Sequence, residues 1–135
     1  MPWCIKKCPY CDFNSHKADK EINERTYIEA LIQDLEANKK FLDNKIITTI
    51  FIGGGTPSLL SGEAYQQLFE YIKSNYNLSN TAEITLEANP GTVDYERFKS
   101  YFDYGINRLS IGIQSFNDKH LKVLKKQGSL ISILI

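Results

Sequence analysis

Three cysteines crowded near the start of the chain are the residues with the most chemical potential. Cys4, Cys8 and Cys11 are the only cysteines in the 135-residue sequence, and three and two residues separate them in turn. An odd number of cysteines in one short segment is a poor basis for disulfides. Soft thiolates close together in one loop instead suit zinc or an iron–sulfur cluster. The spacing therefore predicts a metal site.

The spacing alone leaves three interpretations of this segment open. In the first, three thiolates hold a [4Fe–4S] cluster and leave one iron free for an exchangeable ligand. In the second, His16 completes a Cys3His set around a structural zinc ion. In the third, the thiols carry no metal at all. His16 taken by itself is more typical of a solvated loop residue than of a ligand.

Alternating strands and helices follow the cysteine segment and must position whatever acts with it. Residues 1–20 lack apolar periodicity and are predicted to be a loop. After them, apolar stripes at helical spacing alternate with short β-branched runs bounded by turn residues. The predicted elements are a helix over Asn23–Leu42 with Ile28, Leu31, Ile32 and Leu35 on one stripe, a strand over Ile46–Ile52, a helix capped by Ser61 and carrying Tyr65, Leu68, Phe69 and Ile72, a strand over Ala82–Ala88, a helix from a Thr92 cap to about Tyr104, a strand over Arg108–Gln114, and a helix over Asn117–Lys126.

This alternation predicts an α/β fold with a parallel sheet. One face of each later strand is apolar, with Ile84, Leu86 and Ala88 in one and Leu109, Ile111 and Ile113 in the next. We expect the covering helices to lie on these faces. The opposite faces are too polar for a sheet that is covered on both sides. A sheet curled around a ligand cavity, as in a TIM-like barrel, explains them, with chemistry at the carboxyl ends of the strands. Residues there are Gly53, Gly54, Gly55, Glu87 and Gln114.

The overall composition is that of a water-soluble globular domain. Sixteen basic residues balance sixteen acidic ones, so no net charge attracts nucleic acid. No apolar run approaches the roughly 20 residues that a membrane-spanning helix needs. The first residues, Met1 to Cys4, do not resemble a signal peptide. We therefore expect a cytoplasmic protein with no membrane span and no nucleic-acid partner.

Four ordered motifs give the chain a family resemblance. CIKKCPYC resembles the CxxxCxxC motif of the radical S-adenosylmethionine (SAM) family, and GGGTPS after a strand resembles the glycine motif of that family. EANPGT and NRLSIGIQSF resemble its later strand ends. The match runs from Pro2 to about Leu124, so it implies a partial TIM-like radical SAM barrel, truncated to about three strand–helix units. In this family, reductive cleavage of SAM produces methionine and a 5′-deoxyadenosyl radical.

Within the family, CPYCDFNSH resembles the heme chaperone branch (HemW type), related to oxygen-independent coproporphyrinogen III oxidases. Those oxidases carry a further cysteine where this chain has Phe13, which favours the chaperone branch. The resemblance implies heme binding and delivery to an acceptor protein, with the cluster and SAM in support. Porphyrinogen oxidation in porphyrin biosynthesis is the alternative, and a non-enzymatic zinc module using His16 is another. The sequence leaves open whether the chain is an enzyme.

The resemblance also implies roles for single residues. Cys4, Cys8 and Cys11 would ligate the [4Fe–4S] cluster, whose free iron would take the amino and carboxylate groups of SAM. Glycine carries no side chain, so its backbone can approach the methionine end of SAM closely. Each role also has a simpler alternative: the glycines form only a tight turn, Glu87 and Gln114 are solvated polar residues, and the ring of Tyr10 only packs. The implied SAM contacts are Tyr10, Gly54, Gly55, Thr56, Glu87 and Gln114.

Both ends of the sequence depart from the family pattern. The family has a strand ending in a YIHIPWC-like sequence, of which this chain has the last few residues. Lys126 stands where related oxidases place an arginine that contacts SAM. Residues 1–127 are interpreted as the N-terminal part of the radical SAM core, and residues 128–135 as a divergent apolar tail. We expect a fragment of a longer protein, marginal in stability because its sheet has open edges.

Overall fold

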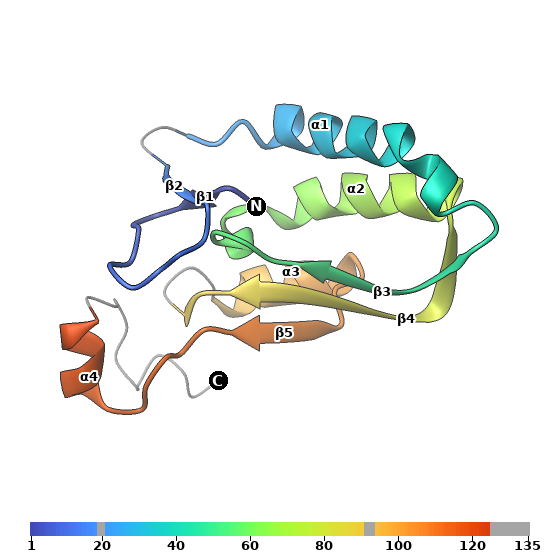
Figure 1. Ribbon diagram of the computed structural model, residues 1–135. Helices are drawn as coiled ribbons and strands as arrows, with labels where there is room; N and C mark the ends of the chain where they lie inside the picture. Colours follow the sequence, from blue (N-terminus) through green and yellow to red (C-terminus); the bar gives the residue numbers. More distant parts are fainter. Residues whose placement is uncertain (19–20, 91–93, 125–135) are drawn as a thin grey trace.

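In a computed structural model, which describes residues 1–18, 21–90 and 94–124, the chain forms an α/β fold around a three-stranded parallel sheet (Figure 1). The strands lie in the order β3-β4-β5, so strands adjacent in the chain are neighbours in the sheet. The predicted α/β class with alternating strands and helices is confirmed. The elements are β1 (Trp3–Cys4), β2 (His16–Lys17), α1 (Glu24–Ala37), a 3₁₀ helix η1 (Lys39–Phe41), β3 (Ile46–Ile52), a 3₁₀ helix η2 (Pro57–Leu59), α2 (Gly62–Asn75), β4 (Asn77–Ala88), α3 (Tyr95–Asp103), β5 (Arg108–Ile111) and α4 (Asp118–Val123).

Helices α1, α2 and α3 share one hydrophobic core with β4. Ile84 and Leu86 of β4 are buried in this core, which confirms the predicted apolar face of that strand. The helix α2 begins after Ser61, the predicted N-cap, whose hydroxyl accepts the amide hydrogen of Ala64. The predicted stripes also lie in or against the core, with these members: Ile28, Leu31, Ile32, Leu35, Tyr65, Leu68, Phe69 and Ile72.

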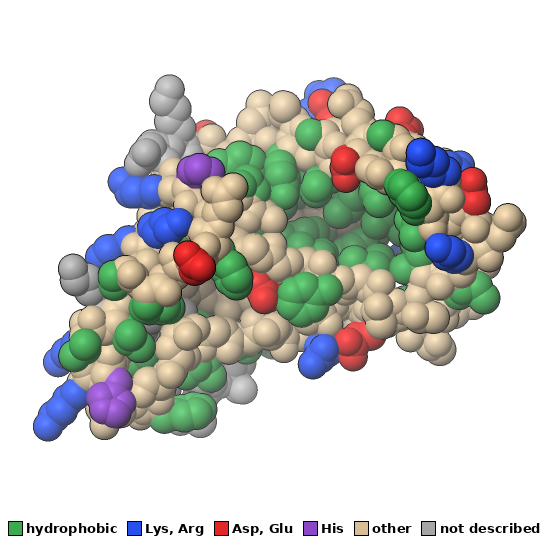
Figure 2. All heavy atoms as spheres, in the orientation of Figure 1, with side chains coloured by type: hydrophobic (Ala, Val, Ile, Leu, Met, Phe, Trp, Pro, Cys, Tyr) green, Lys and Arg blue, Asp and Glu red, His purple; other side chains and the backbone are tan. Residues whose placement is uncertain are grey.

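The opposite face of the sheet carries polar residues, some of them exposed, such as Glu83 and Arg108, and one of them buried, Thr85. Glu83 and Arg108 lie on this face of β4 and β5, and their side chains form an ion pair of 3.0 Å. Phe51 of β3 is also largely exposed there. Figure 2 shows, on the face that it draws, hydrophobic side chains gathered in a hollow between α1 and β3. The sheet is thus covered by helices on one face only, among the described residues.

The last strand is shorter than predicted. β5 ends at Ile111 instead of Gln114, and Gln114 has a φ of 69°. A left-handed residue does not belong to a strand, so Gln114 lies outside β5, and the last hydrogen bond to β4 among the described residues comes from the Gly112 amide to the Ala88 carbonyl at 3.0 Å. The expectation that helices cover the apolar face of this strand is wrong for the described residues, because Leu109 and Ile111 are 37% and 41% exposed.

Two helix boundaries also differ from the prediction. α1 ends at Ala37 instead of Leu42, because the Asn38 side-chain amide donates to the carbonyl oxygen of Asp34 at 2.9 Å and closes the last turn. α3 begins after Asp94, whose carboxylate accepts the amide hydrogen of Arg97 at 2.9 Å. Asp94 is therefore the N-cap of the helix, and the predicted cap, Thr92, lies outside the described residues.

Residues 1–20 were predicted to be a loop, but this segment contains two short strands. β1 and β2 pair in parallel, with Trp3 opposite His16 and Cys4 opposite Lys17. Such a pairing joins residues distant in the sequence, so apolar periodicity could not indicate it. Lys126 and the predicted tail, residues 128–135, lie outside the described part of the chain. None of the described helices is long and apolar enough to cross a membrane.

Candidate functional site

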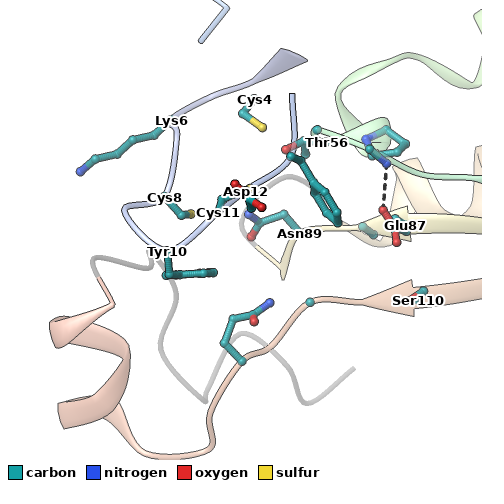
Figure 3. A pocket seen from close by; sticks show the side chains of 17 residues that line it. Cys4, Lys6, Cys8, Tyr10, Cys11, Asp12, Thr56, Glu87, Asn89 and Ser110 are labelled. Carbon is teal, nitrogen blue, oxygen red and sulfur yellow. Dashed lines mark hydrogen bonds between the residues drawn. The ribbon is translucent and has the colours of Figure 1, made fainter. Parts of the chain in front are cut away.

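A pocket of about 350 Å³ opens at the carboxyl ends of β3, β4 and β5, beside the cysteine segment (Figure 3). The carboxyl ends of parallel strands are the usual place for a site in such folds. The pocket joins segments that are more than 100 residues apart in the chain. Its lining includes all nine of the predicted site residues: Cys4, Cys8, Tyr10, Cys11, Gly54, Gly55, Thr56, Glu87 and Gln114.

The three cysteines form one wall of the pocket and are free thiols. Cys4 is buried at the base of the segment, whereas Cys8 and Cys11 are partly exposed. A turn holds the last two near each other, because the Cys11 amide donates to the Cys8 carbonyl at 3.1 Å. Among the described residues, however, no three cysteine, histidine or carboxylate side chains are already arranged to hold a single metal ion. Three thiols on one wall of the pocket are nevertheless donors of the kind that suits a soft metal.

Tyr10 lies between Cys8 and Cys11 in the sequence and at the pocket mouth in the structure. Its side chain is 45% exposed. Partial burial raises the pKa of Tyr10 to about 12, with a hydrogen bond to the Cys8 side chain and the nearby charges of Cys8 and Cys11 acting in the same direction. The phenol therefore stays neutral at physiological pH.

The glycine segment after β3 forms the facing wall of the pocket. Gly54 has a φ of 109°, which side chains rarely allow, and a Cβ there would lie 2.6 Å from the carbonyl oxygen of Met1. A Cβ on Gly55 would overlap the carbonyl of Trp3, at 2.9 Å from its carbon. The amides of Gly55 and Thr56 donate to the carbonyls of Met1 and Trp3 at 2.6 and 2.7 Å. Glycine is required here because the N-terminal backbone packs directly against it.

Glu87 connects this glycine segment to the end of β4. Its carboxylate accepts the amide hydrogen of Gly54 at 3.1 Å. The Met1 ammonium lies nearby and donates to the carbonyl oxygen of Gly53 at 2.9 Å. Burial lowers the pKa of this amino group, and the negative charge of Glu87 opposes that shift. Glu87 therefore has a structural partner and still faces the pocket.

The end of β4 is fixed from behind by the 3₁₀ helix η2. The Ser58 hydroxyl accepts the amide hydrogen of Asn89 at 3.3 Å, and Asn89 lines the pocket. The hydroxyl of Tyr101 donates to the carbonyls of Ser58 and Leu60 at 3.1 and 2.7 Å. A buried tyrosine of α3 thus supports the wall of the pocket through η2. Sequence reasoning could not have found this support, because it joins residues about 40 positions apart.

The pocket also has lining residues that were not predicted as site residues. Asn89, Ser110 and Gly112 share the polar strand faces with Glu87 and Gln114, so strand alternation was the signal that could have found them. His16, which belonged to the alternative Cys3His zinc set, is not among the lining residues of this pocket. The unpredicted lining residues are Lys6, Asp12, Phe13, Pro57, Ala88, Asn89, Ser110 and Gly112.

Comparison with known families places the chain in one of them. Residues 1–133 match the model of the radical SAM superfamily, so the chain belongs to that superfamily. The heme chaperone HemW of Escherichia coli (strain K12) is 50% identical over 124 residues, which are 92% of this chain and 33% of that protein. The heme chaperone HemW of Haemophilus influenzae is 52% identical over 128 residues, with the same two coverages. The chain thus spans about a third of the length of these relatives.

A solved structure agrees with the fold. That of coproporphyrinogen III oxidase (HemN) from Escherichia coli, described as a radical SAM enzyme, superposes with a TM-score of 0.88. Its sequence identity is 25%, and the match covers 98% of this chain and 31% of that one. The predicted partial radical SAM fold is therefore confirmed. The chain is more similar in sequence to the two heme chaperones than to this oxidase.

Proposed function

We propose that this chain is the cluster- and SAM-binding part of a heme chaperone. Cys4, Cys8 and Cys11 bind a [4Fe–4S] cluster through three thiolates. SAM then occupies the rest of the pocket, between the cysteine wall and the ends of the strands. Heme is the cargo, and it passes to an acceptor protein in the cytoplasm. The chain covers only about a third of the chaperones it resembles, so further parts of a whole protein would contribute to heme binding.

The observation that carries this proposal is that one pocket is lined by all nine residues. The cysteines come from the N-terminal segment, the glycines follow β3, Glu87 ends β4, and Gln114 follows β5. Nothing in local sequence requires these four segments to meet. Their meeting places soft sulfur donors opposite a carboxylate and polar side chains, as a cluster with a polar organic ligand needs.

Each wall has a distinct task in this proposal. The thiolates hold the cluster, which supplies an electron for the cleavage of SAM when reducing power is available. Thr56 and the glycines of the facing wall hold the methionine end, where the N-terminal backbone packs against the glycines and fixes this wall. The Glu87 carboxylate accepts hydrogen bonds from ribose hydroxyls, and the Gln114 amide makes a polar contact. Tyr10 lies against the cofactor and covers the pocket mouth.

Porphyrinogen oxidation is the second candidate, because the fold superposes on an oxidase of that class. The chain is twice as similar in sequence to the heme chaperones, at 50–52% against 25% identity. Phe13 lines the pocket where those oxidases carry a further cysteine. Both observations favour the chaperone. Incubation with coproporphyrinogen, SAM and a reductant should therefore yield no protoporphyrinogen.

The first experiment is anaerobic reconstitution of the chain with iron and sulfide. A full cluster gives about four irons and four sulfides per chain, and Cys8→Ala should lose most of them because only two thiolates remain. Ser79→Ala is the control, since Ser79 lies at the opposite end of β4 from the pocket. Stoichiometric zinc without sulfide in the wild type, or full iron loading of Cys8→Ala, would contradict the proposal.

Heme binding is tested separately. The reconstituted chain should be titrated with hemin and followed by its absorbance, with and without SAM. Binding of about one heme per chain supports a cargo site within this part of the protein. If only a full-length relative binds heme, the cargo site lies outside this chain, and the cluster and SAM roles stand by themselves.

A further inference from the structure

The cysteine segment is a closed loop whose base is well fixed. The paired strands β1 and β2 bring residues 4 and 17 together. The amide of His16 donates to the Pro2 carbonyl at 2.7 Å, and that of Ala18 to the Cys4 carbonyl at 2.8 Å. Residues 5–15 form the loop above this base, and they contain two of the three cysteines. The base therefore fixes Cys4 directly, whereas Cys8 and Cys11 depend on contacts within the loop.

Lys7 makes the contacts that cross this loop. Its ammonium group donates to the carbonyl oxygen of Phe13 at 2.8 Å and lies 3.4 Å from that of Ser15. Within the described part of the chain, Lys7 has no carboxylate partner, so its hydrogen bonds go to the backbone. Both distal cysteines lie between the two ends of this bridge, since Cys8 follows Lys7 and Cys11 precedes Phe13. The hydrogen bond from Lys7 to Phe13 thus closes a smaller loop, from residue 7 to residue 13, that contains both thiols.

The returning limb of the loop has little else to hold it. The Ser15 amide donates a hydrogen bond to the carbonyl oxygen of Phe13, which belongs to the same limb, at 2.8 Å. The Ser15 hydroxyl is buried and has no hydrogen-bond partner among the described residues. The side chain of Phe13 is 59% exposed. Among the described contacts, the Lys7 ammonium is therefore the side-chain group that joins the two limbs, between the Cys8–Cys11 turn and the paired strands at the base.

We infer that Lys7 is a positioning residue, which clamps the ligand loop so that Cys8 and Cys11 stay on the pocket wall. This inference rests on the proposed function, because the purpose of the ordered loop is to bind the cluster. A charged donor forms stronger hydrogen bonds to carbonyl groups than a neutral one does. Ordering the loop in advance lowers the entropy lost when its thiolates bind, which favours retention of the cluster.

The first test uses metal-free protein, so it does not depend on cluster binding. Hydrogen exchange of the Ser15 and His16 amides should be about tenfold faster in Lys7→Gln, because the returning limb opens locally. Lys6→Gln is the matched control: it removes the same charge one residue away, and in Figure 3 the Lys6 side chain extends away from the other labelled residues. Lys7→Arg should keep most of the protection, since its guanidinium can donate to both carbonyls.

The outcomes separate a clamp from other roles. Equal acceleration in Lys6→Gln and Lys7→Gln would overturn the inference, because the lost charge alone would then be responsible. Faster exchange throughout β4 in Lys7→Gln would also overturn it, since Lys7 would then support the whole fold. If the Ser15 and His16 amides exchange at the wild-type rate in Lys7→Gln, Lys7 does not hold the returning limb, and the inference is wrong.

The second test measures iron and sulfide after anaerobic reconstitution. Lys7→Gln should retain less than about half of the wild-type cluster after dilution or brief exposure to air, because its loop is less ordered. If the wild type itself binds no cluster, the proposed function fails, and the exchange experiment still decides whether Lys7 is a clamp. If the wild type binds the cluster and Lys7→Gln retains it equally, the inference about Lys7 fails and the proposed function stands.

Discussion

The two walls of the pocket are built in different ways. The sheet wall consists of Gly54, Gly55 and Glu87, held by the ladder of the sheet, by the N-terminal backbone and by η2. The loop wall consists of the cysteine segment, which is mostly exposed and crossed by a single lysine. The sheet wall is held by backbone contacts between distant segments, whereas the loop wall is held at its base, by the Cys8–Cys11 turn and by Lys7. The difference shows that tight backbone packing fixes the sheet wall, while the loop wall depends on a few hydrogen bonds between its two limbs.

The largest expected effect is on the sheet wall. Gly55→Ala places a Cβ against the Trp3 carbonyl, which is backbone and cannot swing aside. We expect the free energy of unfolding to fall by about 2–4 kcal/mol. Urea denaturation followed by circular dichroism measures it.

The control for this change is Gly105→Ala. Gly105 has a φ of 113°, but an added Cβ would meet only the end of the Lys73 side chain, at 3.8 Å. Gly105→Ala should lower the free energy of unfolding by about 1 kcal/mol, because a side chain is strained at this positive φ. Equal losses in the two variants would show that the glycine wall is not tightly packed, and the contrast between the walls would disappear.

The second effect concerns SAM binding by the sheet wall. Glu87→Gln keeps the size of the side chain but removes its negative charge. The carboxylate oxygens of Glu87 accept a hydrogen bond from the Gly54 amide and, in the proposal, from the ribose hydroxyls of SAM. SAM affinity, measured by equilibrium dialysis on reconstituted protein, should fall roughly 10- to 100-fold. Glu83→Gln is the matched control, because Glu83 lies on the same face of β4, pairs with Arg108 and does not line the pocket. If Glu83→Gln lowers SAM affinity as much as Glu87→Gln does, the proposed contact between Glu87 and SAM is wrong.

The sheet wall also predicts how stability depends on pH. Tyr65 and Tyr101 donate hydrogen bonds to the backbone of η2, and burial raises the pKa of both, that of Tyr101 to about 12. Because a raised tyrosine pKa favours the neutral form in the folded protein, this stability is fully present below about pH 10. It is lost as the pH rises from about 10 towards 12. Unfolding by urea between pH 8 and 11.5 should show the decline.

A variant identifies the groups responsible for that decline. Tyr101→Phe should be less stable at pH 8, because two buried carbonyls lose a donor. It should also lose less stability on going to pH 11.5, because one buried phenol no longer ionises. A decline as steep as that of the wild type would assign the pH dependence to other groups.

The parts of this site that could be predicted were local in origin. The cysteine spacing, the glycine triplet and the alternation around Glu87 are readable because each depends on a few neighbouring residues. The reason for the glycines was not readable, because the backbone of Met1 and Trp3 packs against them across some 50 positions. The left-handed backbone of Gln114 was missed as well, since φ is not encoded by alternation. Long-range packing decided these details.

The smallest expected effect is on the loop wall. Phe13→Ala removes a large side chain that is 59% exposed and outside the hydrophobic core. The free energy of unfolding should change by less than about 0.5 kcal/mol, as for other exposed positions. Leu68→Ala, within the core, should cost about 2–5 kcal/mol in the same urea experiment. A loss above about 1 kcal/mol in Phe13→Ala would mean that the loop packs as firmly as the sheet wall. In that case side-chain packing, and not only the hydrogen bonds of Lys7, would hold the loop in place.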